Sequence, residues 1–347
     1  MRAIGSVAVI ASLSGLLQAQ MNSTITAVPG IKVGHHTLTE RPTGCTVILV
    51  DGDGAAGGVA QRGGAPGTRE TDLLDPSNMV DKVNAVVLAG GSAFGLDAAT
   101  GTVRWLEEHN IGWEVRTGKV PIVPAAILFD LGVGDNPKIR PTADCGYRAA
   151  AAASNAVVTE GTIGAGAGAP VGKSGGPGRS MKAGLGSYSI TLPNGLSVGA
   201  IVAVNAVGDI IDPDTGKVVA GVRNPDGTLA DARALLRTGQ TGPRPRAFEN
   251  TTIGVVATNA RLTKAQAHRL ALMADAGLAR AIFPSHTSGD GDTVFALATG
   301  QWPGDADVSQ IGALAADVMA RAIVRAATEA TGLPNFPAVR DLKTMKR

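Results

Sequence analysis

The chain is predicted to form a layered α+β fold in which helices pack against strands. Three observations predict it. Strand-like runs come in adjacent groups, with helical segments set against them rather than in strict strand–helix alternation. Apolar residues make up 44 % of the 347 residues but aromatic residues only 3 %, so the core must be built from Ala, Val, Ile and Leu. The 47 glycines allow the close backbone approach that such small side chains require.

In the first half of the chain, β-branched apolar runs predict strands and Ala-rich runs predict helices. Short strands are expected within residues 24–50, most clearly at 46–50, whereas the Gly-rich segment 51–70 is expected to be a loop. Further along we expect a buried strand at 83–90, a turn and a helix within 90–110, a strand-like segment with two prolines at 119–131, and a helix at 145–156.

The second half begins with a long Gly-rich region at 162–187 and a predicted hairpin at 188–212, with Pro193-Asn194-Gly195 as its turn. Residues 223–249 are polar and rich in Pro and Arg, which predicts an exposed linker. After the linker we expect a strand from Ile253, a helix at 263–282 with Thr263 as its N-cap, a strand at 292–300, and an amphipathic helix at 309–332 that Gly332 and Pro334 terminate.

The N-terminus has the pattern of a secretory signal. Arg2 precedes a short apolar stretch that ends in a small residue, which predicts a signal peptide at 1–19 with cleavage after Ala19. The mature protein would then be periplasmic or secreted. The alternatives are an N-terminal helix, or Met21 as the true start, which would make the protein cytoplasmic.

Charge and hydropathy exclude some classes of partner. The net charge is +2 and no basic run interleaves with aromatic residues, so no nucleic-acid partner is expected. No segment reaches the roughly 18 to 20 uninterrupted apolar residues of a membrane span. The five histidines are scattered and no Cys/His cluster occurs, so neither a metal site nor a cofactor is expected. Cys45 and Cys145 are expected to be two separate buried thiols, although they could pair in an oxidising compartment.

Two glycine-rich motifs resemble known sites without matching them. The segment 167–174, AGAPVGKS, loosely fits a phosphate-binding loop, but GGPGRS follows where a helix should open. Lys173 is therefore either a surface lysine or an amine brought close to a reacting group. The segment 90–94, GGSAF, nearly matches a nucleophile elbow around Ser92, but the final glycine is one residue late. The alternative is a tight turn.

The stretch 286–295, HTSGDGDTVF, places two carboxylates just before a strand. A calcium loop would need further acidic residues that are missing. Asp290 and Asp292 form either a polar turn or a site that holds an ammonium group of the enzyme or of a substrate.

The sequence Asn250-Thr251-Thr252 begins a buried strand, where it could be a simple exposed strand end. It could also be a cleavage site that makes Thr251 a new N-terminus. A threonine hydroxyl needs a base, and the free α-amine of the same residue, with a pKa near 8, can serve. Such a nucleophile further needs an oxyanion donor, a group that tunes the amine and a positioning acid. Asn205, Lys173 and the aspartate pair are suitable types.

The chain resembles, over nearly all of its mature length, the self-processing family of L-aminopeptidase/D-esterases, β-aminopeptidases and nylon-oligomer hydrolases. The stretches that carry the resemblance are PGIKVGHHT, PTGCTVIL, VVLAGGSAFGLDAA, VPAAILFDL, AGAPVGK, AVNAVGDIID, NTTIGVVATNA and HTSGDGDTVFALATG. The resemblance implies a four-layer αββα sandwich of the N-terminal-nucleophile type. It also implies cleavage of one hydrolase domain into an α fragment, 20–250, and a β fragment, 251–347, and a homo-oligomer, often a tetramer.

The resemblance assigns roles residue by residue. Thr251 matches the nucleophile, Asn250 the residue before the cut, and Asn205 the asparagine near the oxyanion. Lys173 matches a lysine beside the nucleophile in the nylon-oligomer hydrolases, and Asp290 with Asp292 matches their acidic pair.

The aminopeptidase members carry Ser-x-Glu and a serine nucleophile at the corresponding positions. A family tyrosine aligns with Phe129, which removes one hydroxyl and puts rate and substrate in question. Phe129, Gly91 and Ser92 are expected in the substrate pocket.

The sequence thus predicts a self-cleaving N-terminal threonine hydrolase of amide bonds, an aminopeptidase or amidase. Its expected substrates are short peptides or ω-amino amides with a free amine, with 6-aminohexanoate oligomers credible because of the Asp-Gly-Asp form. One alternative is an acyltransferase that uses the same acyl-enzyme, which product analysis with added amine would distinguish. Another is a non-catalytic relative, favoured if no covalent adduct forms at Thr251.

Overall fold

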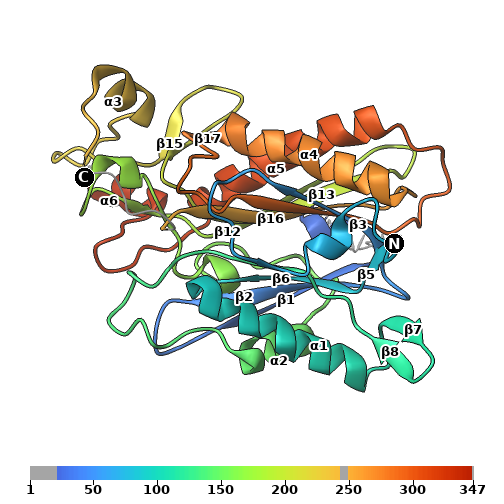
Figure 1. Cartoon of the computed structure of the whole chain (residues 1–347). Coiled ribbons are helices and arrows are strands. Elements are labelled where there is room, and N and C mark those ends of the chain that lie inside the picture. The colour runs from blue at the N-terminus through green and yellow to red at the C-terminus, as the bar shows by residue number, and fades with distance from the viewer. Residues whose placement is uncertain (1–21, 243–248, 346–347) are drawn as a thin grey trace, which may run out of the picture.

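A computed structural model describes residues 22–242 and 249–345. Two large β-sheets lie face to face, and a pair of helices covers the outer face of each, as Figure 1 shows. The predicted α+β class and the αββα sandwich are both confirmed. The predicted signal peptide and Met21 lie outside the described residues.

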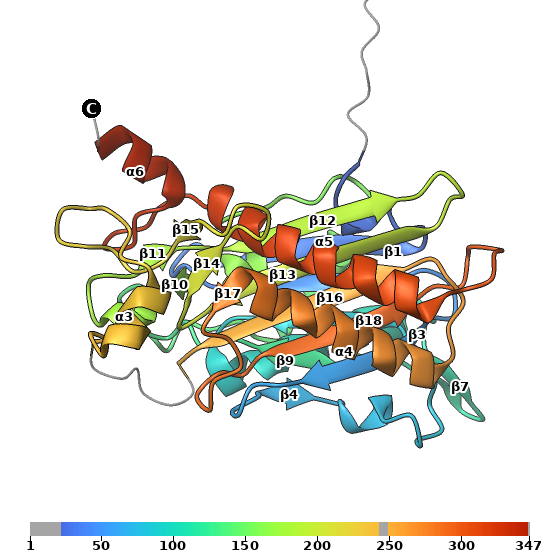
Figure 2. The same ribbon diagram turned by 90° about the horizontal axis from the view of Figure 1, so that it is seen from above.

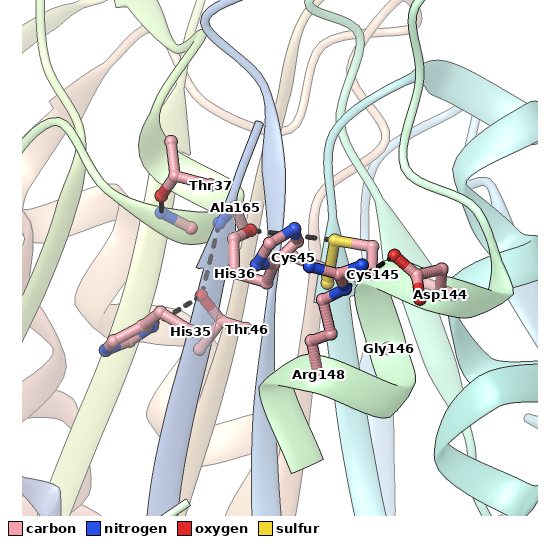
Figure 3. The surroundings of a disulfide bond; sticks show 12 residues. His35, His36, Thr37, Cys45, Thr46, Asp144, Cys145, Gly146, Arg148 and Ala165 are labelled. Carbon is pink, nitrogen blue, oxygen red and sulfur yellow. Dashed lines mark hydrogen bonds and ion pairs between the residues drawn. A yellow bond between two sulfur atoms is a disulfide. The ribbon is translucent and has the colours of Figure 1, made fainter. Parts of the chain in front are cut away.

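The five-stranded sheet forms one inner layer. Its strands are, in spatial order, β1 (Ile31–Thr37), β2 (Gly44–Val50), β6 (Ala85–Ala89), β9 (Ala125–Ile127) and β4 (Thr68–Arg69). Its outer face packs against α1 (Ala98–Glu108) and α2 (Ala143–Ala151). Cys145, at the start of α2, is bonded to Cys45 on β2, so this helix is covalently tied to the sheet (Figure 3). The prediction of two separate thiols was wrong because the partners are 100 residues apart and meet only through the fold.

The six-stranded sheet forms the other inner layer. Its strands are, in spatial order, β12 (Leu185–Thr191), β13 (Ser197–Asn205), β16 (Thr251–Thr258), β18 (Thr293–Ala298), β3 (Ala55–Gln61) and β5 (Lys82–Val83). Its outer face packs against α4 (Lys264–Ala281) and α5 (Val308–Thr328), which run side by side across the sheet in Figure 2. Thr263 caps α4 through a capping box with Gln266, as its position in the sequence predicts.

Strand β3 was predicted to be a loop because of its glycines. Gly58 is needed there because α4 lies directly on the strand: a Cβ at this position would come within 2.4 Å of the backbone carbon of Ala267. The glycines that suggested a loop therefore allow close contact between helix and sheet.

The remaining strands and α-helices of the described residues are short. They are β7 (Trp113–Val115), β8 (Gly118–Val120), β10 (Pro170–Val171), β11 (Met181–Lys182), β14 (Asp209–Ile211), β15 (Val218–Ala220), β17 (Ile282–Phe283), α3 (Ala232–Thr238) and α6 (Val339–Met345). The part of the predicted linker that the structure describes is mostly exposed or half-buried, but it contains α3, which the sequence analysis did not predict. No helix in the described ranges is long and apolar enough to cross a membrane.

The core between the two sheets consists mainly of aliphatic side chains, with Phe295 as its largest apolar member. Strand β16 lies inside this frame, between β13 and β18, and all of its residues are buried. Its first residue, Thr251, is therefore buried rather than open to solvent.

Candidate active site

Thr251 is the first residue of the buried strand β16. It pairs with Asn205, the last residue of the antiparallel strand β13, while β18 runs parallel on the other side. Thr251 is 4 % exposed and Asn250 is 3 % exposed. The alternative interpretation of this stretch as an exposed strand end is therefore wrong.

The carbonyl oxygen of Asn250 accepts two hydrogen bonds. The Thr251 hydroxyl donates to it, and the backbone N–H of Gly291 donates to it at 2.9 Å. Gly291 lies so close to Thr251 that a Cβ on it would be 2.8 Å from Thr251 Oγ1. The bond between Asn250 and Thr251 thus has a hydroxyl on one side and an N–H donor on its carbonyl oxygen.

Lys173 lies beside the same segment and points away from solvent. Its Nζ donates to Asn205 Oδ1 at 2.8 Å, to Asn205 O at 3.0 Å and to Glu249 O at 2.7 Å. Burial lowers the pKa of Lys173 to about 7, although the negative charges of Asp290 and Glu249 favour the ammonium form. The amine can therefore exchange a proton near neutral pH, and it is not a surface lysine.

Asn205, which pairs with Thr251, is also connected to the loop after β9. Its Nδ2 donates to Phe129 O at 2.8 Å and to Glu249 O at 3.4 Å. The side chain therefore contacts the carbonyl of Glu249, one residue before the Asn250 carbonyl that accepts from Gly291 N and the Thr251 hydroxyl.

The predicted pocket residues Gly91 and Ser92 lie next to Phe129. Ser92 N donates to Leu128 O at 3.0 Å, and Gly91 N donates to Asp130 Oδ1 at 2.9 Å. Gly91 has φ 87°, a left-handed conformation that favours glycine and makes the turn between β6 and α1 tight. The structure thus brings the three predicted pocket residues to one region, connected to Thr251 through Asn205.

A buried ion pair anchors this region. Arg41 Nη2 lies 2.7 Å from Asp130 Oδ1, and Thr43 Oγ1 donates to Asp130 Oδ2 at 2.6 Å. Arg41 Nη1 also donates to Val133 O at 3.0 Å. Because both charged side chains are fully buried, the pair depends on these additional hydrogen bonds.

Asp290 and Asp292 flank Gly291 and have different surroundings. Asp292 Oδ1 accepts from Thr252 N at 2.7 Å, whereas Asp290 Oδ2 accepts from Thr287 N at 2.7 Å. Asp290 Oδ1 is buried without a hydrogen-bond partner among the described residues. Burial, and then the charge of Asp292, raise the pKa of Asp290 to about 6. This pair is not a plain polar turn, because both carboxylates are buried.

Several residues that contact this site were not predicted from the sequence. Gly291 was regarded only as the spacer in Asp-Gly-Asp. Arg41 and Asp130 belong to no local sequence pattern. His286 contacts Asp292, and Asp275 contacts His286. Asp275 could have been noticed, since it is a carboxylate on the apolar face of an otherwise regular amphipathic helix.

Neither glycine-rich motif has the geometry of the site that it resembles: one is not a phosphate-binding loop, and the other is not part of a catalytic triad. Residues Lys173–Gly175 form a single 3₁₀ turn rather than the start of an α-helix, which removes the geometry of a phosphate-binding loop. Ser92 does lie in a strand–turn–helix, but no hydrogen bond joins it to a histidine among the described residues. The turn interpretation is therefore the better one.

The four-layer arrangement, with a buried threonine opening a central strand, is that of the N-terminal-nucleophile fold. The chain belongs to peptidase family S58, whose family model matches residues 23–338. An uncharacterized aminopeptidase of Mycobacterium leprae is 46 % identical, over 92 % of this chain and 95 % of the relative. A 6-aminohexanoate-oligomer endohydrolase of a Kocuria species is 32 % identical, over 86 % of this chain and 84 % of the relative.

A solved structure shows the same fold. The L-aminopeptidase D-Ala-esterase/amidase of Ochrobactrum anthropi, described as a variant of the Ntn hydrolase fold, matches with a TM-score of 0.67 over 93 % of each chain. At 20 % identity this likeness concerns the fold alone. Together the comparisons confirm the resemblance that the sequence motifs predicted.

Proposed function

We propose that the protein is an amide-bond hydrolase that cleaves itself between Asn250 and Thr251 and then uses Thr251 as its nucleophile. The observation that carries this proposal is the position of the Thr251 hydroxyl, which lies on the carbonyl of Asn250 while Gly291 N–H contacts the same oxygen at 2.9 Å. A donor on the carbonyl oxygen is what stabilises the charge that develops when a hydroxyl attacks the carbon.

The cleavage step balances without a cofactor. The Thr251 Oγ bonds to the Asn250 carbonyl carbon, the amide C–N bond breaks, and the hydroxyl proton ends on the released amine. Water then hydrolyses the ester, which leaves a carboxylate on Asn250 and a free amine on Thr251. In the following reaction this amine is the base that accepts the hydroxyl proton from the same residue.

The remaining roles follow from the positions of the polar groups. Lys173, with a pKa lowered to about 7 by burial, can tune the proton balance beside the new amine. Asn205 is proposed as an oxyanion donor once the Glu249 segment no longer occupies its Nδ2. Asp290 and Asp292 are proposed to hold the N-terminal amine and the start of β16 in place.

The proposed substrates are short peptides or ω-amino amides. The relatives named aminopeptidase and 6-aminohexanoate-oligomer endohydrolase support amide substrates of this kind. Phe129 stands where tyrosine is found in other members of the resembled family, so the substrate range of those members does not transfer directly. Gly91, Ser92 and Phe129 are proposed to line the acyl side of the site.

We further propose that the protein is exported and forms an oligomer. The disulfide between Cys45 and Cys145 supports an oxidising compartment, in agreement with a signal peptide at 1–19. We propose that the mature protein consists of an α fragment, 20–250, and a β fragment, 251–347, assembled as a homo-oligomer, a tetramer by the family resemblance.

The test is hydrolysis of a panel of dipeptides, β-peptides and 6-aminohexanoate oligomers by the purified protein. The expected result is amide hydrolysis by wild type and none by Thr251→Ala, which stays uncut, while Thr251→Ser retains some of both. An active and cut Thr251→Ala variant would overturn the proposal. Products with an added amine acceptor distinguish hydrolysis from acyl transfer, and inactivity of wild type on the whole panel would favour a non-catalytic relative.

A further inference from the structure

A chain of polar groups runs from β16 to α4 behind the proposed nucleophile. Asp292 Oδ1 accepts from Thr252 N at 2.7 Å. Its other oxygen, Oδ2, accepts from His286 N at 3.0 Å and lies 3.1 Å from His286 Nδ1. On the far side of the ring, His286 Nε2 lies 3.4 Å from Asp275 Oδ2. Backbone N–H, carboxylate, imidazole and carboxylate thus follow one another across three elements.

This row of polar groups is largely buried, which is energetically unfavourable for charged side chains. The side chains of Asp275 and Asp292 are 7 % and 4 % exposed, and that of His286 is 23 % exposed. Asp275 lies on the buried face of α4 beside Ala274 and Leu278, where an unpaired carboxylate would be strongly unfavourable. A purely structural position on this helix face would be better served by an apolar residue.

The backbone of His286 is also unusual. Its φ of 55° lies in the left-handed region, which non-glycine residues rarely adopt. This conformation lets both the backbone N–H and the ring of His286 meet the same oxygen of Asp292. Retained backbone strain next to a reactive group is typical of residues that position it.

We propose that His286, held by Asp275, is a positioning residue for the reaction: it fixes the Asp292 carboxylate, which in turn fixes the backbone directly after Thr251. This inference rests on the proposed function, since it concerns the same nucleophile. His286 touches neither Thr251 nor Asn250, so it acts through Asp292.

The charges around the ring predict its protonation. Asp275 faces it from α4, and Asp290 and Asp292 face it from the loop before β18. The positive charge of Arg62, which follows β3, lowers the pKa of Asp275. The Asp292 carboxylate, which lies 3.1 Å from Nδ1, and the nearby Asp275 and Asp290 raise the pKa of His286, despite partial burial. A protonated His286 places a positive charge between Asp275 and Asp292.

The test compares two replacements of His286. His286→Asn keeps an N–H donor near the Nδ1 position and tolerates the left-handed backbone, but it carries no charge and does not reach Asp275. His286→Gln places its amide nearer to the Nε2 position. His109→Asn, at an exposed histidine on the end of α1, is the matched control.

The expected result is an upward shift of the acidic limb of the kcat/KM pH profile in both His286 variants, by about one pH unit. Without the histidine cation, Asp290 takes up its proton at higher pH. The control should keep the wild-type profile. A uniform loss at every pH, with the limb unmoved, would overturn the proposal and leave His286 a structural residue.

A second readout does not depend on activity. The His286 ring is titrated by NMR in ¹³C-histidine-labelled Thr251→Ala protein, with and without Asp275→Asn. The expected pKa lies above 6.5 and falls by roughly one unit when Asp275 is neutralised. A value at or below 6.5 in both proteins would overturn the pairing even if a His286 variant fails to fold. A wild-type protein that is uncut and inactive would overturn the proposed function together with the positioning role, whereas an active enzyme with an unmoved limb overturns only the latter.

Discussion

Thr251 directs its hydroxyl onto the carbonyl oxygen of Asn250, the residue that precedes it in the chain. The two residues lie at the buried start of β16, where Thr251 pairs with Asn205 of β13 and Asn250 forms a bridge with Asp290, just before β18. Because the backbone here belongs to a central strand, the hydroxyl and the carbonyl are positioned by the fold and not by a flexible loop.

Asn205→Ala should lower turnover far more than it lowers stability. Loss of an oxyanion donor costs roughly 10²-fold or more in kcat, whereas the free energy of unfolding should fall by only about 1 to 3 kcal/mol. Steady-state kinetics and urea unfolding of the same preparation measure both. Asn259→Ala is the matched control, because Asn259 is a buried asparagine that bonds Ser197 N and Gly195 O away from the site. Equal effects of the two substitutions on turnover would remove Asn205 from the oxyanion role.

Gly291→Ala should slow self-cleavage. The added Cβ would come within 2.8 Å of Thr251 Oγ1, so the hydroxyl or the loop must move, while the N–H donor itself remains. A displacement of this size is expected to slow the reaction by roughly tenfold to a hundredfold. The rate at which the two fragments appear after synthesis of the chain measures it. Gly132→Ala, where a Cβ meets open space, should cleave at the wild-type rate, and normal cleavage of Gly291→Ala would argue against a close fit at Thr251.

Asp290→Asn should stabilise the folded protein above pH 6. Burial and the neighbouring Asp292 raise the pKa of Asp290 from 3.8 to about 6, so the folded state binds this proton more tightly than the unfolded state does. The stability it contributes is fully present below pH 3.8 and is lost as the pH rises through about 6. Neutralising the residue removes a penalty of about 2 to 3 kcal/mol above that pH.

The comparison is best made in a Thr251→Ala background, so that both proteins are uncut. Denaturant unfolding of Thr251→Ala with and without Asp290→Asn, at pH 5 and pH 8, gives the difference directly. It should be larger at pH 8. A difference independent of pH would mean that Asp290 titrates normally in the folded protein.

The purified protein should contain a disulfide and lose stability without it. Cys45 and Cys145 close a loop of 100 residues, for which chain entropy gives roughly 4 to 5 kcal/mol as an upper estimate. Alkylation under denaturing conditions without a reductant should modify neither cysteine in protein from an oxidising compartment. Cys45→Ala with Cys145→Ala should unfold at a lower denaturant concentration. Two alkylated thiols in protein recovered from an oxidising compartment would contradict the pairing.

The sequence was informative where a pattern is local. Helix α4 with its Thr263 cap and the strands around Thr251 follow from periodicity and capping residues within a few positions of one another. The family motifs brought together the residues of the site. Strand β3 was missed because its Gly58 is required by a helix that lies directly on the strand, and no local pattern reveals that contact.

The contacts behind the site could not be predicted for a different reason. His286 and Asp275 are eleven positions apart and meet because α4 packs on the outside of the sheet and the chain then turns back toward β18. The disulfide depends likewise on α2 packing against β2. Each residue type was visible in the sequence, but the distance between partners was set by the packing of layers.

The intact mass of the purified protein under denaturing conditions tests the central claim most directly. Two fragments are expected, the smaller of which begins at Thr251, and a single chain is expected for Thr251→Ala. A wild-type protein that remains one uncut chain would contradict the account, because no free amine would then exist beside the Thr251 hydroxyl.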